Sequence, residues 1–398
     1  MSKLDKLIAN LCPDGVEYKK IGDIADYEQP SKYLVKSTNY NNSFNTPVLT
    51  AGQTFILGYT NETDGVFKAS KQHPVIIFDD FTGAFKWVDF PFKAKSSAMK
   101  MITAKEGVLI RYLFHLMGNL NFSSNEHKRL WIGFYSDIKI PVPPIEIQQE
   151  IVRILDNFTE LTAELTAELT ARKKQYYFYR NRLLDSFKKD TYKSLDNFGS
   201  WRGGKTPSMA EKVFWENGTL PWITSKDMKE STLSDTKDHI TQLAISEASM
   251  TVYPKNSIAI VTRSGILKHT FPVAYIPFKT AVNQDIKVLV VNKNVLPRYA
   301  FHVLQGKGQD ILIKTKKQGG TVDSVDFQKV LAYKAPLPSI AEQQRIVDIL
   351  DRFDSLCNDI SMGLPAEIEA RKKQYEYYRD KLLTFPEKKK EGEDRATN

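Results

Sequence analysis

Few residues of this chain stand at spacings that would support chemistry, and the strongest match is a glycine-rich segment. Residues 199–206 read Gly-Ser-Trp-Arg-Gly-Gly-Lys-Thr, which fits the spacing of a phosphate-binding loop. Such a loop needs a buried strand before it and a helix directly after it. Here no buried-strand pattern precedes the segment, and Pro207 pushes Thr206 into an extended shape. We therefore interpret the match as accidental and expect a glycine-rich basic loop suited to nucleic-acid phosphate.

The other candidates for catalysis are isolated. The six histidines form no pair at metal-ligand spacing, and His115 and His302 stand in apolar helical stretches where packing is expected. Asp79-Asp80 follows a buried-strand pattern, but no Glu-x-Lys follows it at nuclease-like spacing. The corresponding place in a second copy of this unit, described below, holds Thr262-Arg263. There is also no Gly-rich cofactor loop and no Asn-Pro-Pro-aromatic motif for base methylation. We predict that the chain is not an enzyme and has no metal or cofactor of its own.

Basic side chains on loops point to a different activity. The formal net charge is +9 and the pI is near 9.1, which favours a polyanionic partner. Reading DNA bases needs polar groups on loops, surrounded by Lys and Arg for phosphates. The clearest clusters are residues 127–131 (His-Lys-Arg-Leu-Trp) and 314–321, each shortly before a Pro-x-Pro sequence. We expect both to be exposed and to hold phosphate, and a merely solvated run of charge is the alternative.

Further candidates lie after short strand patterns, where Asn and Gln suit adenine and Arg263 suits guanine. The residues predicted to contact DNA are Tyr27, Gln29, Lys32, Thr50, Gln53, Lys93, Lys95, Lys128, Arg129, Trp131, Arg202, Lys205, Ser225, Lys226, Arg263, Gln284, Lys316, Lys317 and Gln318.

The organisation that must position these residues is a duplication. Residues 148–158 read Gln-Gln-Glu-Ile-Val-Arg-Ile-Leu-Asp-Asn-Phe, and residues 343–353 repeat this pattern 195 positions later. The sequence Ala-Arg-Lys-Lys-Gln-Tyr recurs identically at 171–176 and 370–375. The segments before these helical patterns are only faintly alike, although Tyr-x-Phe-His occurs at 112–115 and at 299–302. A conserved scaffold carrying two divergent modules is the simplest interpretation.

The repeated segments predict long helices. Apolar residues at Ile147, Ile151, Ile154, Phe158, Leu161 and Leu165 alternate steps of four and three, which is the seam of a coiled coil. The step to Leu169 is a stutter inside the repeat Thr162-Ala163-Glu164-Leu165, Thr166-Ala167-Glu168-Leu169. A helix of about 40 residues would be about 60 Å long and needs an equally long partner. The second copy supplies one, interrupted at 362–365, with Pro365 placed for a first helical turn. Helices that pack only on their own modules are the alternative.

Taken together, the duplicated modules, the Gln-Gln-x-Ile-Val-x-Ile-Leu-Asp segments and the Thr-Ala-Glu-Leu repeat resemble the specificity subunits of type I restriction–modification systems, type IC in particular. The resemblance covers about Val16 to Pro386. It implies two target recognition domains, each reading one half of a split, asymmetric site in double-stranded DNA. It also implies helices that set the gap between the half-sites and dock two methyltransferase subunits, through which two motor–nuclease subunits join. S-adenosylmethionine, ATP and Mg²⁺ would belong to those partners.

On this resemblance, Thr162, Leu165, Thr166 and Leu169 form the adjustable spacer. The residues expected to dock the methyltransferase subunits are Gln148, Gln149, Arg172, Lys173, Tyr176, Gln343, Gln344, Arg371, Lys372 and Tyr375. The main rival function is a non-catalytic adaptor whose two modules bind other proteins.

The predicted fold is α+β, with two globular α/β recognition domains joined by two long antiparallel coiled-coil helices in a pseudo-twofold repeat. We place the domains at 1–144 and 189–338, the helices at 145–188 and 339–386, and a charged, disordered tail at 387–398. Two cysteines are too few for a zinc site or a disulfide framework. Neither a signal peptide nor a membrane-length apolar run is present, so a soluble, cytoplasmic protein is expected.

Overall fold

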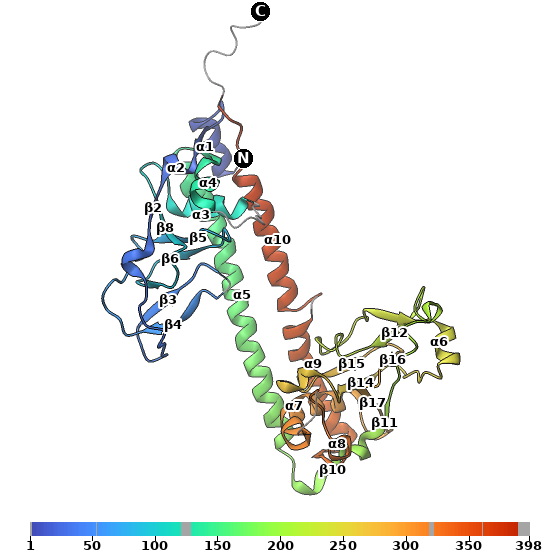
Figure 1. Cartoon of the computed structure of the whole chain (residues 1–398). Coiled ribbons are helices and arrows are strands. Elements are labelled where there is room, and N and C mark those ends of the chain that lie inside the picture. The colour runs from blue at the N-terminus through green and yellow to red at the C-terminus, as the bar shows by residue number, and fades with distance from the viewer. Residues whose placement is uncertain (1, 53, 121–128, 318–321, 360, 389–398) are drawn as a thin grey trace, which may run out of the picture. The chain divides into compact units, whose positions relative to one another are not determined.

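The computed structural model describes residues 2–52, 54–120, 129–317, 322–359 and 361–388, and these form two compact units. Unit 1 comprises residues 1–165 and 368–398, and unit 2 comprises residues 166–367. The division falls between Leu165 and Thr166, inside the tetrapeptide repeat. Figure 1 shows the helices and strands of both units and labels many of them.

The globular part of unit 1 is built from short strands and helices. Its helical segments are α1 (Lys3–Leu11), α2 (Ile21–Ile24), η1 (Pro30–Tyr33), α3 (Ile110–Asn119), α4 (Leu130–Gly133) and η2 (Tyr135–Asp137). Its strands are β1 (Glu17–Lys20), β2 (Ala25–Glu28), β3 (Thr46–Leu49), β4 (Ile56–Thr60), β5 (Val75–Asp79), β6 (Phe85–Val88), β7 (Lys93–Ala94), β8 (Met99–Ala104) and β9 (Lys139–Val142). They form three sheets with the orders β2-β8-β5-β6, β4-β3-β7 and β1-β9.

Unit 2 repeats this plan. Its helical segments are η3 (Lys189–Thr191), η4 (Leu195–Phe198), η5 (Lys212–Phe214), α6 (Gln242–Glu247), η6 (Gly265–Lys268), α7 (Pro297–Thr315) and α8 (Phe327–Ala332). Its strands are β10 (Tyr192–Ser194), β11 (Gly199–Gly203), β12 (Leu220–Ile223), β13 (Asp238–Ile240), β14 (Ser257–Val261), β15 (Val273–Ile276), β16 (Ala281–Val282), β17 (Ile286–Val291) and β18 (Lys334–Pro336). The sheet orders β11-β17-β14-β15, β13-β12-β16 and β10-β18 match those of unit 1 strand for strand.

The matching sheets also share their directions. All pairs are antiparallel except β3 with β7 and β12 with β16, which are parallel and occupy equivalent places. The near-continuous apolar runs Val75–Phe78 and Ile258–Val261 are buried along their whole length, which explains why β5 and β14 are inner strands of their sheets. The duplication predicted from the helical segments therefore extends to the globular modules, although their sequences have diverged.

The predicted long helix is observed as α5, an unbroken helix from Ile145 to Asp185. The second helical segment is two helices, α9 (Ile340–Asn358) and α10 (Leu364–Leu382). Pro365 is the second residue of α10, in the first turn as predicted. The carboxylate of Asp359 accepts hydrogen bonds from the backbone of Ser361 and Met362 and closes the turn between these helices.

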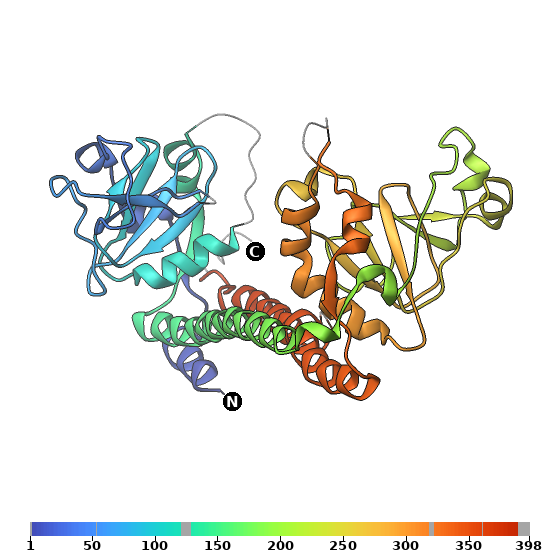
Figure 2. The same cartoon turned by 90° about the horizontal axis from the view of Figure 1, so that it is seen from below.

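Each unit contains a pair of antiparallel helices. In unit 1, α10 lies beside the N-terminal part of α5 (Figures 1 and 2). Between these two helices, Phe158 stacks on Tyr378 at 5.3 Å between ring centroids. In unit 2, Phe353 of α9 contacts Tyr176 and Tyr179 of the C-terminal part of α5. The predicted apolar seam of α5 contacts two different partners in unit 1. Ile147 and Ile151 are buried in the core of the module, whereas Phe158 packs on the second helix. The helices therefore pack on each other as well as on the modules, and the alternative, in which they pack only on their own modules, is wrong.

The C-terminal tail requires a correction. Residues from 387 onward were predicted to be disordered, but Glu387 forms a β-bridge with Val16 and Lys388 donates a backbone hydrogen bond to it. Residues 389–398 lie outside the described residues. The boundaries proposed for the recognition domains remain predictions.

Candidate nucleic-acid interface

Loops that follow four strands of unit 2 meet at one place. The amide of Lys205 donates to the carbonyl of Val282, and the amide of Asn283 donates to the carbonyl of Ile223, both at 3.0 Å. The hydroxyl of Thr206 donates to the side-chain oxygen of Gln284 at 2.6 Å. We define the loop cluster of unit 2 as residues 203–206, 224–227, 262–264, 283–285 and 322–325.

The structure brings most of the predicted DNA-contacting residues of unit 2 to this cluster. Lys205, Lys226, Arg263 and Gln284 are exposed within it, Ser225 is partly exposed, and the exposed Arg202 stands immediately before it on β11. Lys316 and Lys317 are tied to its edge, because Lys316 forms a 2.8 Å ion pair with Asp323 and the amide of Lys317 donates to Ser324. Gln318 lies outside the described residues.

Unit 1 has the equivalent cluster, defined as residues 50–52, 80–82, 95–98 and 129–131. The amide of Lys95 donates to the carbonyl of Leu49, as Asn283 does to Ile223 in unit 2. The amide of Leu130 donates to the carbonyl of Asp80, as Val325 does to Thr262. Matching hydrogen bonds therefore place Leu130 and Val325 at equivalent positions of the two units.

The predicted residues of unit 1 divide into three groups: those that are exposed, those that lie outside the described residues and those that are buried. Lys95 and Arg129 are exposed in the cluster, and Thr50 is partly exposed there, with its hydroxyl donating to the carbonyl of Thr54. Tyr27, Gln29 and Lys32 are also exposed, on β2 and the segment after it. Gln53 and Lys128 lie outside the described residues.

The third group corrects the prediction. Lys93 is buried with a side-chain exposure of 2%, and its ammonium forms a 2.8 Å ion pair with Glu62 and donates to the carbonyl of Asp64. Trp131 was expected on an exposed segment but is buried against Phe78 and Tyr27. Neither side chain can reach DNA in this conformation, and both stabilise the module instead.

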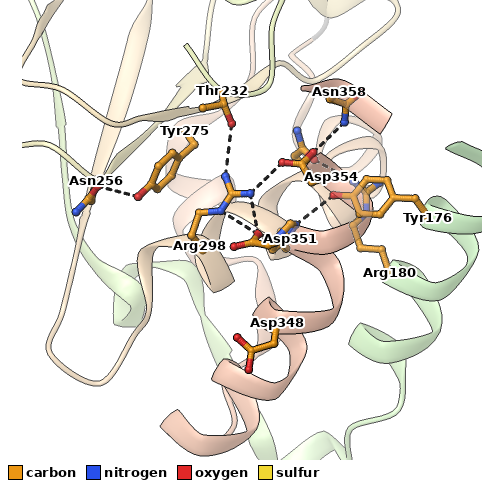
Figure 3. Close-up of polar contacts among 12 residues, drawn as sticks. Tyr176, Arg180, Thr232, Asn256, Tyr275, Arg298, Asp348, Asp351, Asp354 and Asn358 are labelled. Carbon is orange, nitrogen blue, oxygen red and sulfur yellow. Dashed lines mark hydrogen bonds and ion pairs between the residues drawn. The ribbon is translucent and has the colours of Figure 1, made fainter. Parts of the chain in front are cut away.

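A polar junction that occurs in both units connects each module to its helices. In unit 2, Arg298 of α7 forms ion pairs with Asp351 and Asp354 of α9 at 2.7 and 2.9 Å (Figure 3). The buried His302 contacts Asp351 through Nε2 at 2.6 Å and the hydroxyl of Tyr176 through Nδ1 at 3.2 Å. The junction thus connects α7, α9 and the C-terminal part of α5 within this unit.

Unit 1 contains the same junction. Arg111 and His115 of α3 both contact Asp156 of α5, at 2.7 and 2.9 Å, and His115 contacts the hydroxyl of Tyr375 at 3.1 Å. Burial lowers the pKa of His115, against the opposing effect of its hydrogen bond to Asp156. Burial alone would raise the pKa of Asp156, but hydrogen bonds from His115 and Arg111 outweigh it and lower the pKa. The neutral imidazole and ionised carboxylate therefore form a structural contact, consistent with the packing role expected for both histidines.

Several residues predicted to dock the methyltransferase subunits have side chains that are buried in contacts within their own unit. Gln148 is buried, with its side chain accepting from the amide of Leu109 at 2.9 Å and donating to the carbonyls of Gly107 and Pro143. Gln343 makes the same three contacts, with Leu296, Asn294 and Pro338. These glutamines, and Tyr176 in the junction, are too buried to contact a partner directly, so the prediction is wrong for them.

The other predicted docking residues are accessible. Gln149, Gln344 and Lys372 are exposed, while Arg172, Lys173, Arg371 and Tyr375 are partly exposed. The exposed aromatic side chains Tyr177, Phe178 and Tyr377 lie on the same helices but were not among the predicted docking residues. The sequence also assigned no role to Arg111, Asp156, Arg298 and Asp351, although their identity at matching positions of the repeat is a signal that could have found them.

Two further observations concern chemistry and membranes. Residues 199–203 form the extended strand β11, and no α-helix follows directly, so the glycine-rich segment lacks the geometry of a phosphate-binding loop. Within the described ranges there is no group of three or more His, Cys, Asp or Glu residues suited to a metal ion. The same ranges contain no helix that is both long and apolar enough to cross a bilayer.

Two modules of one design, with matching loop clusters and each anchored to a helix pair, define a duplicated recognition protein. A family model described as the type I restriction modification DNA specificity domain matches residues 13–172 and again residues 189–370. The chain belongs to this family, which confirms the membership predicted from the repeats. Recognition of DNA sequence in a type I restriction–modification system is therefore its role.

Relatives agree with this assignment, and a solved structure shares the fold. The chain is 52% identical to the Escherichia coli type I restriction enzyme EcoR124I/EcoR124II specificity subunit, over 97% of this chain and 98% of the relative. It is 29% identical to a putative specificity subunit from Haemophilus influenzae, over 93% and 96% of the two chains. The fold resembles that of a type I restriction–modification S subunit from M. genitalium, with a TM-score of 0.59, 12% identity and coverage of 93% and 96%.

Proposed function

We propose that each unit reads one half of a split, asymmetric DNA site through its loop cluster. The observation that carries this proposal is the pairing of the two clusters, which stand on equivalent strand ends but present different side chains. A shared backbone frame gives both units the same approach to a groove, while different loop residues give each its own sequence preference. Exposed basic residues at the edges, such as Arg129 and Lys205, would contact phosphates.

The helix α5 sets the distance between the half-sites in this proposal. Inserting one more Thr-Ala-Glu-Leu within residues 162–169 would lengthen the helix by about 6 Å and rotate it by about 40°. Since DNA rises about 3.4 Å per base pair, the gap should grow by one or two base pairs. Both half-site sequences should stay the same, and a changed half-site in this variant would contradict the assignment of Thr162, Leu165, Thr166 and Leu169 as a spacer.

The chain is proposed to act without catalytic activity, inside a complex in the cytoplasm. Two methyltransferase subunits would dock on accessible residues of the repeated helices, including Gln149, Gln344, Arg172 and Arg371, and two motor–nuclease subunits would join through them. S-adenosylmethionine, ATP and Mg²⁺ would be bound by those partners. The 52% identity to a specificity subunit supports this assembly.

Methylome sequencing of cells with and without this gene tests the proposal. We expect one bipartite motif to lose adenine methylation when the gene is deleted and to regain it on complementation. Purified chain should bind DNA weakly and with steep salt dependence, and bind one motif specifically only with the methyltransferase subunits. If no bipartite motif loses methylation while the chain captures other proteins, the adaptor alternative is correct.

A further inference from the structure

One ion pair in the loop cluster of unit 2 has the geometry of a base-reading device. Nε of Arg263 donates to Oδ1 of Asp285 at 2.7 Å. The side chain of Arg263 is 59% exposed, whereas that of Asp285 is only 21% exposed. With the described residues, the two terminal guanidinium nitrogens of Arg263 form no hydrogen bond. The carboxylate of Asp285 therefore holds the guanidinium group through Nε and leaves its two terminal nitrogens available to a ligand.

The backbone around this pair is fixed. The carbonyl of Asp285 accepts from the amide of Thr262 at 2.8 Å and from its hydroxyl at 2.9 Å, and the amide of Asp285 donates to the side chain of Asn283. Arg263 also forms a β-bridge with Ser324. A side chain oriented on a rigid frame loses less conformational entropy on binding than a free surface arginine.

In unit 1, the positions equivalent to Arg263 and Asp285 are both occupied by other residues. The amide of Thr262 donates to Asp285 in unit 2, and the amide of Asp80 donates to Ala98 in unit 1, each extending its β-ladder by one step. By this match Arg263 is equivalent to Phe81, an exposed phenylalanine, and Asp285 is equivalent to Ala98. The positively charged fork and its carboxylate are thus both absent from unit 1, at the same two positions.

We infer that Arg263 reads a guanine in the half-site of unit 2, with Asp285 as its positioning residue. This inference rests on the proposed function and narrows it to one base of one half-site. The two free nitrogens match the O6 and N7 acceptors that guanine presents in the major groove, and bidentate arginine contacts of this kind are the commonest specific ones.

Two other roles for this pair are less consistent with the structure. A stabilising ion pair is a poor explanation, because exposed pairs contribute little to stability. A phosphate contact needs no orienting carboxylate, and an acidic group beside the fork would weaken attraction to the DNA backbone. A carboxylate that fixes the fork is useful where direction matters, which is the case for a base edge.

The test uses the full chain with the methyltransferase subunits of its own system. Methylation rates are measured on DNA carrying each of the four bases at every position of the half-site read by unit 2. Arg263→Ala should lose discrimination for guanine at one position by about 5- to 150-fold, with the other half-site read normally. Arg263→Gln should move the preference at that position toward adenine. Asp285→Asn should give a smaller loss at the same position, and Arg263→Ala with Asp285→Asn should be no worse than Arg263→Ala alone.

Lys20→Ala is the matched control, because it removes another exposed ion pair of 2.7 Å, with Asp137, from a part of the chain not assigned to DNA. It should leave both half-sites unchanged. Two results would overturn the inference: an unchanged motif in Arg263→Ala, or a uniform loss of binding on all sequences with a reduced salt slope, which indicates a phosphate contact. A parent complex that methylates no bipartite motif would instead contradict the proposed function. Normal reading of the first half-site shows that a variant has folded.

Discussion

The two loop clusters and the two polar junctions of this chain have diverged to very different extents. Each junction contains an arginine and a histidine from the module, an aspartate from the adjoining helix and a tyrosine from the second helix. The loop clusters share backbone hydrogen bonds but differ at matched side chains, such as Asp80 and Thr262 or Phe81 and Arg263. Side chains that hold a module in place are thus retained in both units, while those presented to a ligand are free to differ.

The largest expected difference between the units lies at Asp80 and Thr262, which occupy matched positions in the two loop clusters. Asp80 and Lys100 form an ion pair that is almost fully buried, with side-chain exposures of 2% and 1%, and Asp80 also accepts from the amide of Trp131. Asp80→Ala leaves the Lys100 charge buried without its partner and should cost about 3–5 kcal/mol in the free energy of unfolding. The matched variant Thr262→Ala loses one hydroxyl contact and should cost about 1 kcal/mol. Urea unfolding measures both, and equal losses would show that the clusters are not built differently.

The junctions should respond almost equally. Asp156→Ala and Asp351→Ala each remove the acceptor shared by an arginine and a buried histidine, and each should cost about 2–3 kcal/mol. The loss for Asp351→Ala should be the smaller, because Arg298 keeps Asp354 while the described part of unit 1 offers Arg111 no second carboxylate. Hydrogen exchange can follow each unit separately. A large loss in only one unit would show that the junctions are not equivalent.

The junctions should also make stability depend on pH. Burial lowers the pKa of His302 and of His115, and hydrogen bonds to their aspartates only partly oppose this. The unfolded chain therefore binds more protons below about pH 6.5, so the free energy of unfolding should fall as the pH drops through that value, by up to about 1.4 kcal/mol per histidine and pH unit. His302→Gln should flatten the profile measured by denaturation between about pH 7.5 and about pH 5.5. An unchanged profile in His302→Gln would show that this histidine does not cause the pH dependence.

The smallest effects on stability are expected at the tips of the loop clusters. Phe81 and Arg263 are exposed, so Phe81→Ala and Arg263→Ala should change the free energy of unfolding by less than about 0.5 kcal/mol. The same variants should alter recognition of different half-sites, which methylome sequencing resolves. A variant that loses stability and changes both half-sites would indicate that its side chain belongs to the scaffold.

The sequence predicted the scaffold better than the loops, for identifiable reasons. Helical periodicity and the repeat revealed α5, the interruption near Pro365 and the packing of both histidines, because these depend on local pattern and internal identity. The burial of Lys93 could not be foreseen, since its carboxylate partner Glu62 lies 31 positions earlier and no local pattern links them. The burial of Trp131 could not be foreseen for the same reason. The basic segment before it suggested that it is exposed, whereas it is buried in contact with Phe78 and Tyr27. Whether a side chain is exposed depends on its partners in the tertiary structure, and residue spacing in the sequence does not reveal these partners.

The division of the chain also has a consequence for its biosynthesis. Unit 2 is a single stretch, 166–367, whereas unit 1 needs residues beyond 367, including the pairing of Val16 with Glu387 and of His115 with Tyr375. A ribosome makes these segments only after it has made the whole of unit 2. Unit 1, whose module is made first, therefore stays incomplete, with the α5 surface that α10 covers still exposed. By the time α10 is made, unit 2 has had time to fold. Domains usually fold in the order of their synthesis, and here the order of completion is reversed.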